Sequence, residues 1–205
     1  MSTPRAAGNL SHRFRSYAAR RPWLGYLFAS FDILDAGLAA ARALETARRG
    51  VAPPCAPGCD HCCRNQVVPV TPLEVAGLAW FAVEMTHGAL RAKLAARLAN
   101  TPDNECPFLV EGGCAAYAVR PMPCRKFMVF GARCLPREDV WRTRRNDLLT
   151  PPEACSREAL AVTLPYYGIT SPAEIRAALE EDYFPSIASD LYKCDWHGVA
   201  ARMAG

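Results

Sequence analysis

The chain lacks several features that would place it in a class at once. Its 205 residues contain no internal repeat and no low-complexity tract. No glycine-rich loop follows a strand-like run, so the sequence does not support a nucleotide or S-adenosylmethionine site of that kind. No stretch approaches the about 20 apolar residues that span a bilayer. We therefore expect a chain without a membrane span.

A secretory signal is also missing from the stretch that comes nearest to one. Residues 20–43 read "RRPWLGYLFASFDILDAGLAAARA", and Arg20 with Arg21 imitates a twin-arginine signal. Asp32 and Asp35 interrupt the apolar run, and no Ala-x-Ala site closes it cleanly. The pattern predicts an amphipathic helix that stays on the protein. We expect a cytoplasmic chain, in which thiols stay reduced.

The positive charge is modest and does not indicate a nucleic-acid partner. The formal net charge is +4, and residues 142–147 ("RTRRND") form the one dense basic run. No aromatic side chains alternate with these arginines, as they do in strips that bind single strands. The run therefore predicts a solvated helix face, and no nucleic acid is expected as a partner.

Hydrophobic spacing and capping residues predict mostly helices. Apolar residues recur at helical spacing from Pro22 to Arg49, and Gly50 closes that helix. Thr71, Pro72 and Glu74 form a capping box that starts a helix towards Asn100, with a break at 86–88. A short β-like run covers residues 66–71. Further helices are expected near residues 137–149, 153–162, 171–182 and 185–194, with a second capping box at Ser171 and Glu174.

The middle of the chain is too rich in helix breakers for long elements. Prolines and glycines punctuate residues 101–135. The predicted fold class is mainly α: a small helical domain with an irregular cysteine-rich metal-binding centre and little β structure. Along the sequence we expect an N-terminal arm and amphipathic helix (1–50), a cysteine-cluster core (51–135) and a C-terminal helical segment packing on the core (136–205). Together they would form one globular domain.

Ten cysteines are the most informative residues of the chain, and four of them lie within nine positions. Cys55, Cys59, Cys62 and Cys63 stand at i, i+4, i+7 and i+8 in "CAPGCDHCC". Pro57 and Gly58 exclude one continuous helix, so we expect a loop followed by a helical turn near Cys59. The last three thiols would share one face of that turn, where the positive end of the helix dipole lowers the pKa of a thiol.

A second set of cysteines falls in the breaker-rich segment: Cys106, Cys114, Cys124 and Cys134. A bound metal would supply the folding free energy that this segment cannot supply itself. Packed thiolates repel one another unless a cation neutralises them or they oxidise, so metal binding is the prediction, with a disulfide or redox relay as the alternative. Cys155 and Cys194 have no cysteine neighbours in sequence and read as packing residues.

The identity of the metal stays open between iron and zinc. All-thiolate sets suit zinc, cuprous copper and iron–sulfur clusters. The paired CxxC knuckles typical of zinc sites do not occur, and adjacent cysteines such as Cys62 and Cys63 suit one mononuclear ion poorly because their side chains diverge. We favour an iron–sulfur cluster, either one 4Fe–4S cluster with spare thiols or two metal centres. His61 is a further ligand, a hydrogen-bond donor near the metal, or an exposed residue.

These motifs together resemble a known family. Cys55-x3-Cys59-x2-Cys62-Cys63 followed by "CPFL…GC…Y…RP…CRKF" resembles the CxxCxxCC (YkgJ-like) cysteine-cluster family of zinc- or iron-chelating proteins, over about residues 55–130. The resemblance places seven cysteines, Cys55 to Cys124, on motif positions, and leaves Cys134 and Cys155 beyond the matched segment. Arg120 and Arg125 flank Cys124, and the resemblance implies that their guanidinium groups stabilise a negatively charged cluster and raise its potential.

The predicted function is that of a cytoplasmic metal-binding protein. The favoured reading is an iron–sulfur cluster that serves electron transfer, metal handling or the maturation of a protein partner. One alternative is a structural zinc module that mediates protein interaction. Another is an enzyme whose metal centre acts on a protein or small molecule, although the sequence reveals neither an open coordination position nor a substrate pocket, so no catalytic residue is assigned.

Overall fold

The computed structural model describes residues 9–56, 58–64, 66–136, 138–181 and 183–204. Helices dominate and each strand has only two residues, which confirms the predicted mainly α class. The chain divides into two compact units. Unit 1 combines Met1–Gly50 with Thr150–Ser186, and unit 2 combines Val51–Leu149 with Ile187–Gly205. The predicted division along the sequence stays a prediction.

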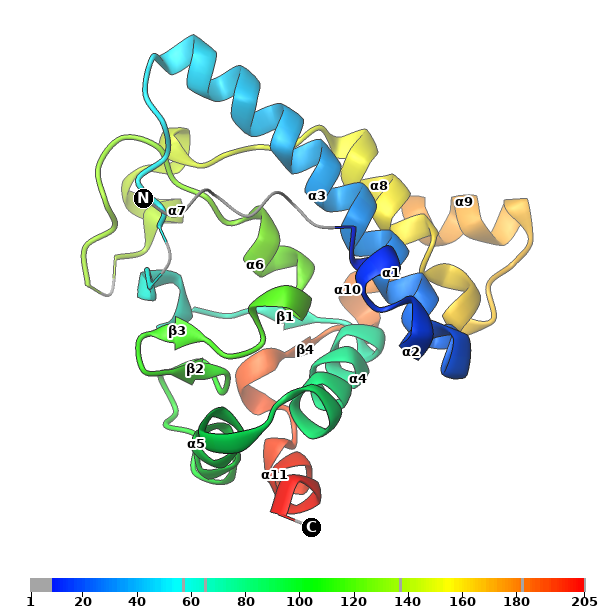
Figure 1. Cartoon of the computed structure of the whole chain (residues 1–205). Helices are drawn as coiled ribbons and strands as arrows, with labels where there is room; N and C mark the ends of the chain where they lie inside the picture. Colours follow the sequence, from blue (N-terminus) through cyan, green and yellow to red (C-terminus); the bar gives the residue numbers. More distant parts are fainter. Residues whose placement is uncertain (1–8, 57, 65, 137, 182, 205) are drawn as a thin grey trace. The chain divides into compact units, whose positions relative to one another are not determined.

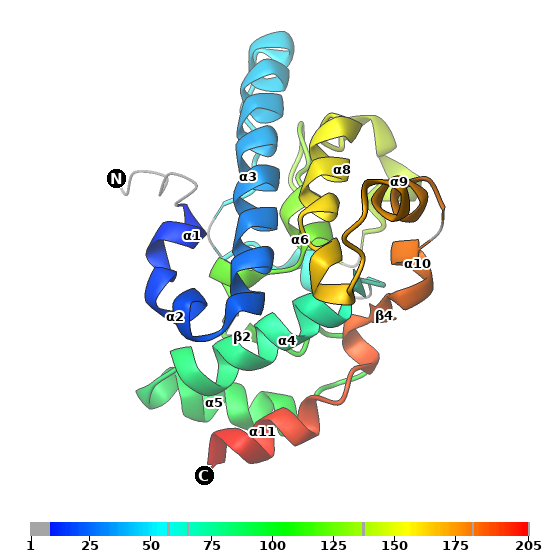
Figure 2. The ribbon, with the colours of Figure 1, turned by 90° about the vertical axis from the view of Figure 1, so that its right-hand side faces the viewer.

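Unit 1 is built around one long helix. Its elements are α1 (Leu10–Arg13), α2 (Arg15–Arg20), α3 (Pro22–Arg49), α8 (Glu153–Ala161), η5 (Leu164–Tyr167), α9 (Pro172–Glu180) and α10 (Tyr183–Ile187), which ends at the unit boundary. α8 packs along α3, as Figure 2 shows. Gly50 ends α3 in the left-handed region (φ 68°), and the capping box of Ser171 and Glu174 opens α9, as predicted.

Asp32 interrupts the apolar run of α3 because it caps another helix. Its two carboxylate oxygens accept hydrogen bonds from the backbone N–H groups of Leu10 (2.6 Å) and Ser11 (3.0 Å) at the start of α1. The rings of Phe14 and Phe28 pack 5.2 Å apart beside this contact. A polar residue inside an apolar helix thus fixes the N-terminal turn on α3.

One helix bears on the expectation that the chain has no membrane span. In the part of the chain that the structure describes, α3 is one helix long and apolar enough to do so by length and composition. Two aspartates are too few to exclude a span on composition alone. This is weak evidence for a span, because 44% of the apolar stretch of α3 is buried inside the protein and the core helix of a globular protein can be equally long and apolar.

The Cys155 side chain packs against α3 at Gly37. Its Sγ atom lies 3.4 Å from the Ile33 carbonyl oxygen, and a Cβ atom placed on Gly37 would lie only 2.1 Å from that sulfur. This is the packing position expected for a lone reduced cysteine. Position 37 therefore requires glycine, because α8 approaches α3 too closely there for a larger side chain.

The Gly37→Ala variant should consequently destabilise unit 1. Overpacking of this kind costs about 1–3 kcal/mol, so the free energy of unfolding in a denaturant titration should fall by that amount. Gly25→Ala is the matched control in the same helix, because a Cβ there meets nothing within 4 Å. That change should stabilise by about 0.5–1 kcal/mol. Equal effects of both alanines would contradict the α3–α8 packing.

Unit 2 carries most of the cysteines on short elements. Its helices and turns are η1 (His61–Cys63), α4 (Pro72–Trp80), the π-helical η2 (Phe81–Met85), α5 (Gly88–Ala99), η3 (Tyr117–Val119), α6 (Met122–Lys126), α7 (Val140–Thr143), η4 (Arg145–Asp147), η6 (Leu191–Lys193) and α11 (Trp196–Ala204). The predicted capping box of Thr71 and Glu74 and the break after Met85 are both confirmed.

Two small antiparallel pairs complete unit 2. β1 (Pro69–Val70) pairs with β4 (Ser189–Asp190), so that Pro69 faces Asp190 and Val70 faces Ser189. β2 (Leu109–Val110) pairs with β3 (Gly113–Cys114). α11 lies against α5 (Figure 1), where Arg91 donates hydrogen bonds to the Met203 and Val83 carbonyls. The C-terminal segment is thereby joined to the cysteine-bearing part of the chain.

Two predicted helices are wrong in length. Of the predicted helix 137–149, the described residues 138–149 hold only the single turns α7 and η4, because Arg144 forms an ion-pair network described below. Residues 185–194 do not form one helix, because Ser189 and Asp190 pair with β1 and the Asp190 side chain then caps η6. The C-terminal helix α11 was not predicted.

Candidate metal centre

The two cysteine-bearing segments are joined through their backbones. The Cys106 N–H donates to the Cys63 carbonyl oxygen (2.8 Å), and Arg64 and Glu105 form a single antiparallel bridge beside it. Ion pairs reinforce the junction. Arg64 contacts both Glu105 and Asp60, and the Arg97 guanidinium lies 2.9 Å from the second Glu105 oxygen. Residues that lie far apart in sequence are therefore held side by side.

A tight hairpin positions Cys114. β2 and β3 meet through Glu111 and Gly112, both with positive φ (50° and 74°), and Cys114 faces Leu109 across the pair. The Ala115 N–H then donates to the Phe108 carbonyl (2.8 Å). Glycine tolerates the left-handed conformation that such a turn requires. The Gly112-Gly113 pair thus returns the chain towards Cys106.

Cys124 is placed by a buried carboxylate. Glu74 completes the capping box of α4, and its second oxygen accepts the Met122 N–H (2.8 Å) at the start of α6, the turn that carries Cys124. Burial raises the pKa of Glu74, while its hydrogen bonds to Thr71 and Met122 and the charge of Arg125 oppose that rise. One side chain therefore caps two helices and fixes the third cysteine-bearing segment.

Five thiols form what we call the inner group: Cys62, Cys63, Cys106, Cys114 and Cys124. Side-chain hydrogen bonds join Cys63 to both Cys62 and Cys106. Cys114 and Cys124 interact electrostatically with each other and with Cys62. Four of the five are partly exposed and Cys106 is buried. Three segments of the chain thus deliver five sulfur atoms to one place.

The pKa values of Cys62, Cys63, Cys114 and Cys124 move in the direction opposite to the one expected from a helix dipole. The hydrogen bond with Cys63 and then burial raise the pKa of Cys62, and the hydrogen bond with Cys106 raises that of Cys63. Burial raises the pKa of Cys114, and that of Cys124 to about 12. The prediction failed because η1 is a single 3₁₀ turn, too short for a useful dipole. Without metal, these groups are neutral thiols.

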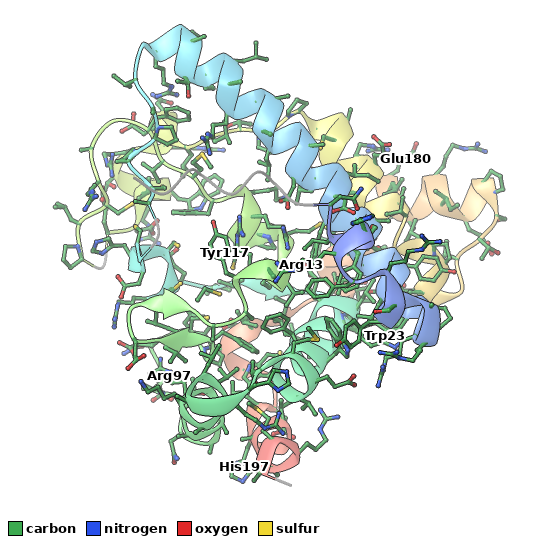
Figure 3. The ribbon with its side chains drawn as sticks, viewed as in Figure 1. Arg13, Trp23, Arg97, Tyr117, Glu180 and His197 are labelled. Atoms are coloured by element: carbon green, nitrogen blue, oxygen red, sulfur yellow. The ribbon has the colours of Figure 1, made fainter. Side chains whose placement is uncertain are left out.

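The two arginines predicted to assist a cofactor occupy different environments. The charge of Arg120 lowers the pKa of Cys62, Cys114 and Cys124, so it acts on the inner group. Its guanidinium stacks 3.9 Å from the centroid of the Tyr117 ring, beside α6 (Figure 3). Arg125 is only 3% exposed, and donates to the Arg120 and Ala118 carbonyls. Its buried charge holds the 118–125 turn and also reaches Cys114.

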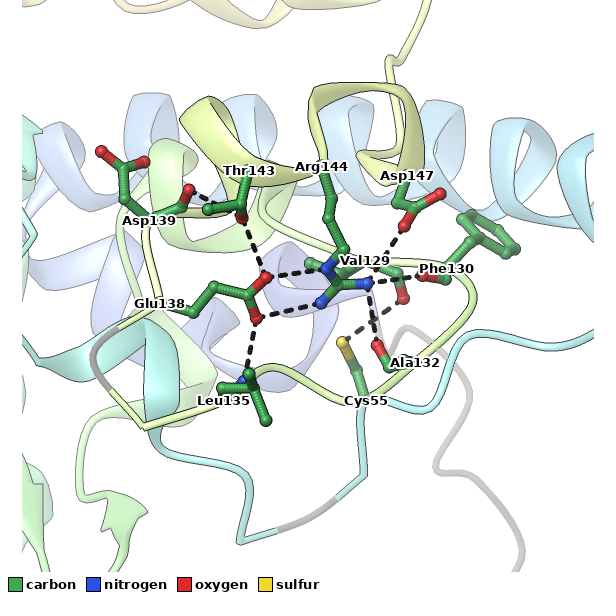
Figure 4. A network of polar contacts seen from close by, with 10 residues as sticks. All are labelled: Cys55, Val129, Phe130, Ala132, Leu135, Glu138, Asp139, Thr143, Arg144 and Asp147. Carbon is green, nitrogen blue, oxygen red and sulfur yellow. Dashed lines mark hydrogen bonds and ion pairs between the residues drawn. The ribbon is translucent and has the colours of Figure 1, made fainter.

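The remaining predicted ligands form a separate outer group of Cys55, Cys59 and Cys134. The charges of Cys55 and Cys59 each contribute to the raised pKa of Cys134, after burial. The Cys55 sulfur lies 3.9 Å from the Val129 carbonyl (Figure 4), and both Cys55 and Cys59 are exposed. Cys55 also interacts with Cys62. The eight predicted ligands therefore divide into five inner and three outer thiols.

Arg144 fixes the loop that carries Cys134. Its guanidinium pairs with both Glu138 oxygens (2.8 and 3.1 Å) and with Asp147 (3.0 Å), and donates to the Ala132 carbonyl (Figure 4). The hydrogen bond from Arg144 lowers the pKa of Glu138 to about 2. The basic run 142–147 is thus only partly the solvated face that was predicted: Arg142 is exposed, while Arg144 is the centre of a network.

The donor set fits a thiolate-bound metal in its chemistry. Five sulfurs meet the needs of zinc, iron or an iron–sulfur cluster. Among the described residues, no three His, Cys, Asp or Glu side chains already stand as an ion requires. Protonated thiols hydrogen-bond in pairs, and they converge on an ion only when it displaces their protons. Metal binding at this site therefore requires a local adjustment of the sulfurs.

The fold and the grouped thiols are thus those of a small cysteine-rich metal-binding protein. It belongs to the CxxCxxCC family, described as "Putative zinc- or iron-chelating domain", whose model matches residues 54–156. That description supports metal binding. The match extends beyond the segment of resemblance and takes in Cys134 and Cys155 as well. No curated protein and no solved structure matched the chain significantly.

Proposed function

We propose that this protein is a cytoplasmic carrier of an iron–sulfur cluster held by the inner thiols, and that it serves electron transfer, metal handling or the maturation of a protein partner. The observation that carries the proposal is the gathering of five cysteine sulfurs from three segments at the Cys63–Cys106 junction. A bound cluster would accept and release single electrons at a potential set by its surroundings.

Two features support a cluster. The inner group supplies the four thiolates that a 4Fe–4S cluster takes, with one thiol to spare. Arg120 also places positive charge beside these sulfurs, which offsets the net negative charge of an all-thiolate cluster. The exposed outer thiols Cys55 and Cys59 are accessible to metal from outside, which agrees with metal handling.

A structural zinc module is the second candidate, and one observation favours it. Cys62 and Cys63 were expected to diverge, yet their side chains are hydrogen-bonded to each other. Adjacent cysteines that approach this closely can serve one ion. The argument that the Cys62 and Cys63 side chains diverge too far to bind a single zinc ion is therefore weakened.

Anaerobic purification from iron-replete cells tests the proposal, with the visible spectrum, iron, zinc and acid-labile sulfide measured on one sample. We expect a brown protein with broad absorption near about 400 nm and with iron and sulfide in equal amounts, the signature of a thiolate-bound cluster. A colourless protein with stoichiometric zinc would establish the second candidate. A protein without either metal would contradict both.

A further inference from the structure

A tyrosine outside the residues that the family model matches interacts electrostatically with the inner thiols. Tyr192 lies in η6, near the C-terminus. Burial is the first cause that raises the pKa of its phenol group, and the charges of four inner thiols follow, in the order Cys106, Cys63, Cys124 and Cys62. The family model ends at residue 156, so nothing in it assigns this side chain a place at the metal centre.

The fold holds Tyr192 firmly in this position. The Leu191 N–H donates to the Val68 carbonyl (2.9 Å), which continues the β1–β4 pairing, and the Asp190 carboxylate accepts the Tyr192 N–H (3.1 Å). Trp196 closes the turn by donating from Nε1 to the Leu191 carbonyl (2.7 Å). The Trp196 ring packs edge to face against Phe108, with the two ring centroids 4.8 Å apart. Phe108 lies two residues after Cys106 in the sequence. The C-terminal segment is thus attached directly to the cysteine-bearing loop.

The hydroxyl of Tyr192 is buried without a hydrogen-bond partner among the described residues. Leaving a buried hydroxyl unpaired costs free energy, so a native orphan of this kind calls for a ligand that completes it. A second buried donor without a partner is Nε of Arg97, a residue of α5 (Figure 3). The Nη2 atom of the same guanidinium donates hydrogen bonds to Glu105 and to the Cys106 carbonyl. Two buried donors without partners therefore belong to residues that interact with Cys106.

Neutral thiols are weak hydrogen-bond acceptors, but metal-bound thiolates carry negative charge and accept strongly. We propose that the Tyr192 hydroxyl donates a hydrogen bond to a metal-bound thiolate of the inner group, Cys106 or Cys63, and so belongs to the metal centre. The inference rests on the proposed function, because it needs metal in the inner group.

Tyr192→Phe tests the inference, with zinc(II) as the probe. Reduced, metal-free protein is titrated anaerobically against a colorimetric chelator, and thermal unfolding is recorded with and without zinc. Loss of an outer hydrogen bond to a ligand typically weakens metal affinity about 10–100-fold, and we expect a loss in that range. The melting temperature of the metal-free protein should stay unchanged or rise, because the hydroxyl has no partner there. Tyr26→Phe, in α3 of unit 1 and 37% exposed, is the matched control and should change neither quantity.

Two outcomes overturn the inference while leaving the proposed function intact. Wild-type zinc affinity in Tyr192→Phe would show that the hydroxyl does not reach a ligand. A fall in metal-free stability that accounts for the whole loss of affinity would reduce Tyr192 to a packing residue. If the wild-type protein takes up no zinc, the thiol site itself is refuted, and the inference falls with it.

Discussion

Replacing Cys62 and Cys63 together by serine should leave the protein without bound metal. The double variant keeps only three inner thiols, fewer than the four thiolates that a structural zinc ion or a 4Fe–4S cluster takes. It also removes the sulfur that is hydrogen-bonded to Cys62 and Cys106 at once. Loss of a group that hydrogen-bonds to a metal ligand lowers metal affinity about 10–100-fold, so loss of two ligands themselves should lower it by more than that. Metal content of the purified protein measures the effect.

A second double variant provides the control with the same number of cysteines changed. Cys155→Ser/Cys194→Ser removes two thiols that hydrogen-bond to backbone carbonyls, Cys155 to Ile33 and Cys194 to Asp190. Its metal content should equal that of the wild type. Full metal content in Cys62→Ser/Cys63→Ser, or loss of metal in the control, would show that the ligands are other residues.

Metal affinity should fall steeply as the pH is lowered from 8 to 6. In the metal-free protein Cys62, Cys63, Cys114 and Cys124 have raised pKa values and are protonated across this range, whereas a ligand must be a thiolate. Each thiol that gives up its proton adds about a tenfold change in affinity per pH unit. Zinc competition with a chelator of known pH dependence measures the slope. A slope near zero would contradict thiol ligation.

The stability of the metal-free protein should decrease at alkaline pH. A thiol with a raised pKa in the folded state is protonated there while the unfolded chain begins to ionise near about pH 8.5. The unfolded state then binds fewer protons, so the free energy of unfolding decreases as the pH rises above that value. The contribution of these thiols is fully present below it.

Local signals in the sequence predicted much of the fold. The helix from Pro22 to Arg49, both capping boxes and the break after Met85 depend on residues within one or two turns, and all are confirmed. The errors lie where distant contacts decide. Pairing of Ser189 and Asp190 with β1 breaks the predicted helix 185–194, and ion pairs of Arg144 shorten the one at 137–149. Periodicity alone contains no information on such partners.

The candidate site was predicted in its members but not in its arrangement. Spacing identified the cysteines, whereas the division into inner and outer groups depends on the Cys63–Cys106 backbone bond and the β2–β3 hairpin. Glu74 was recognised as a helix cap, but its bond to Met122 joins segments far apart in sequence. Tyr192 had no signal at all, because its approach to the thiols depends on the β1–β4 pair.

Counting the protons released by metal binding tests most directly whether the inner thiols are the ligands. Zinc is titrated calorimetrically into reduced, metal-free protein at pH 7 in two buffers of different ionisation enthalpy. Four thiols that become thiolates should release about four protons per zinc ion. Release of fewer than about one proton per ion would mean that carboxylates or imidazoles bind the metal, and the inner group would not be a metal centre.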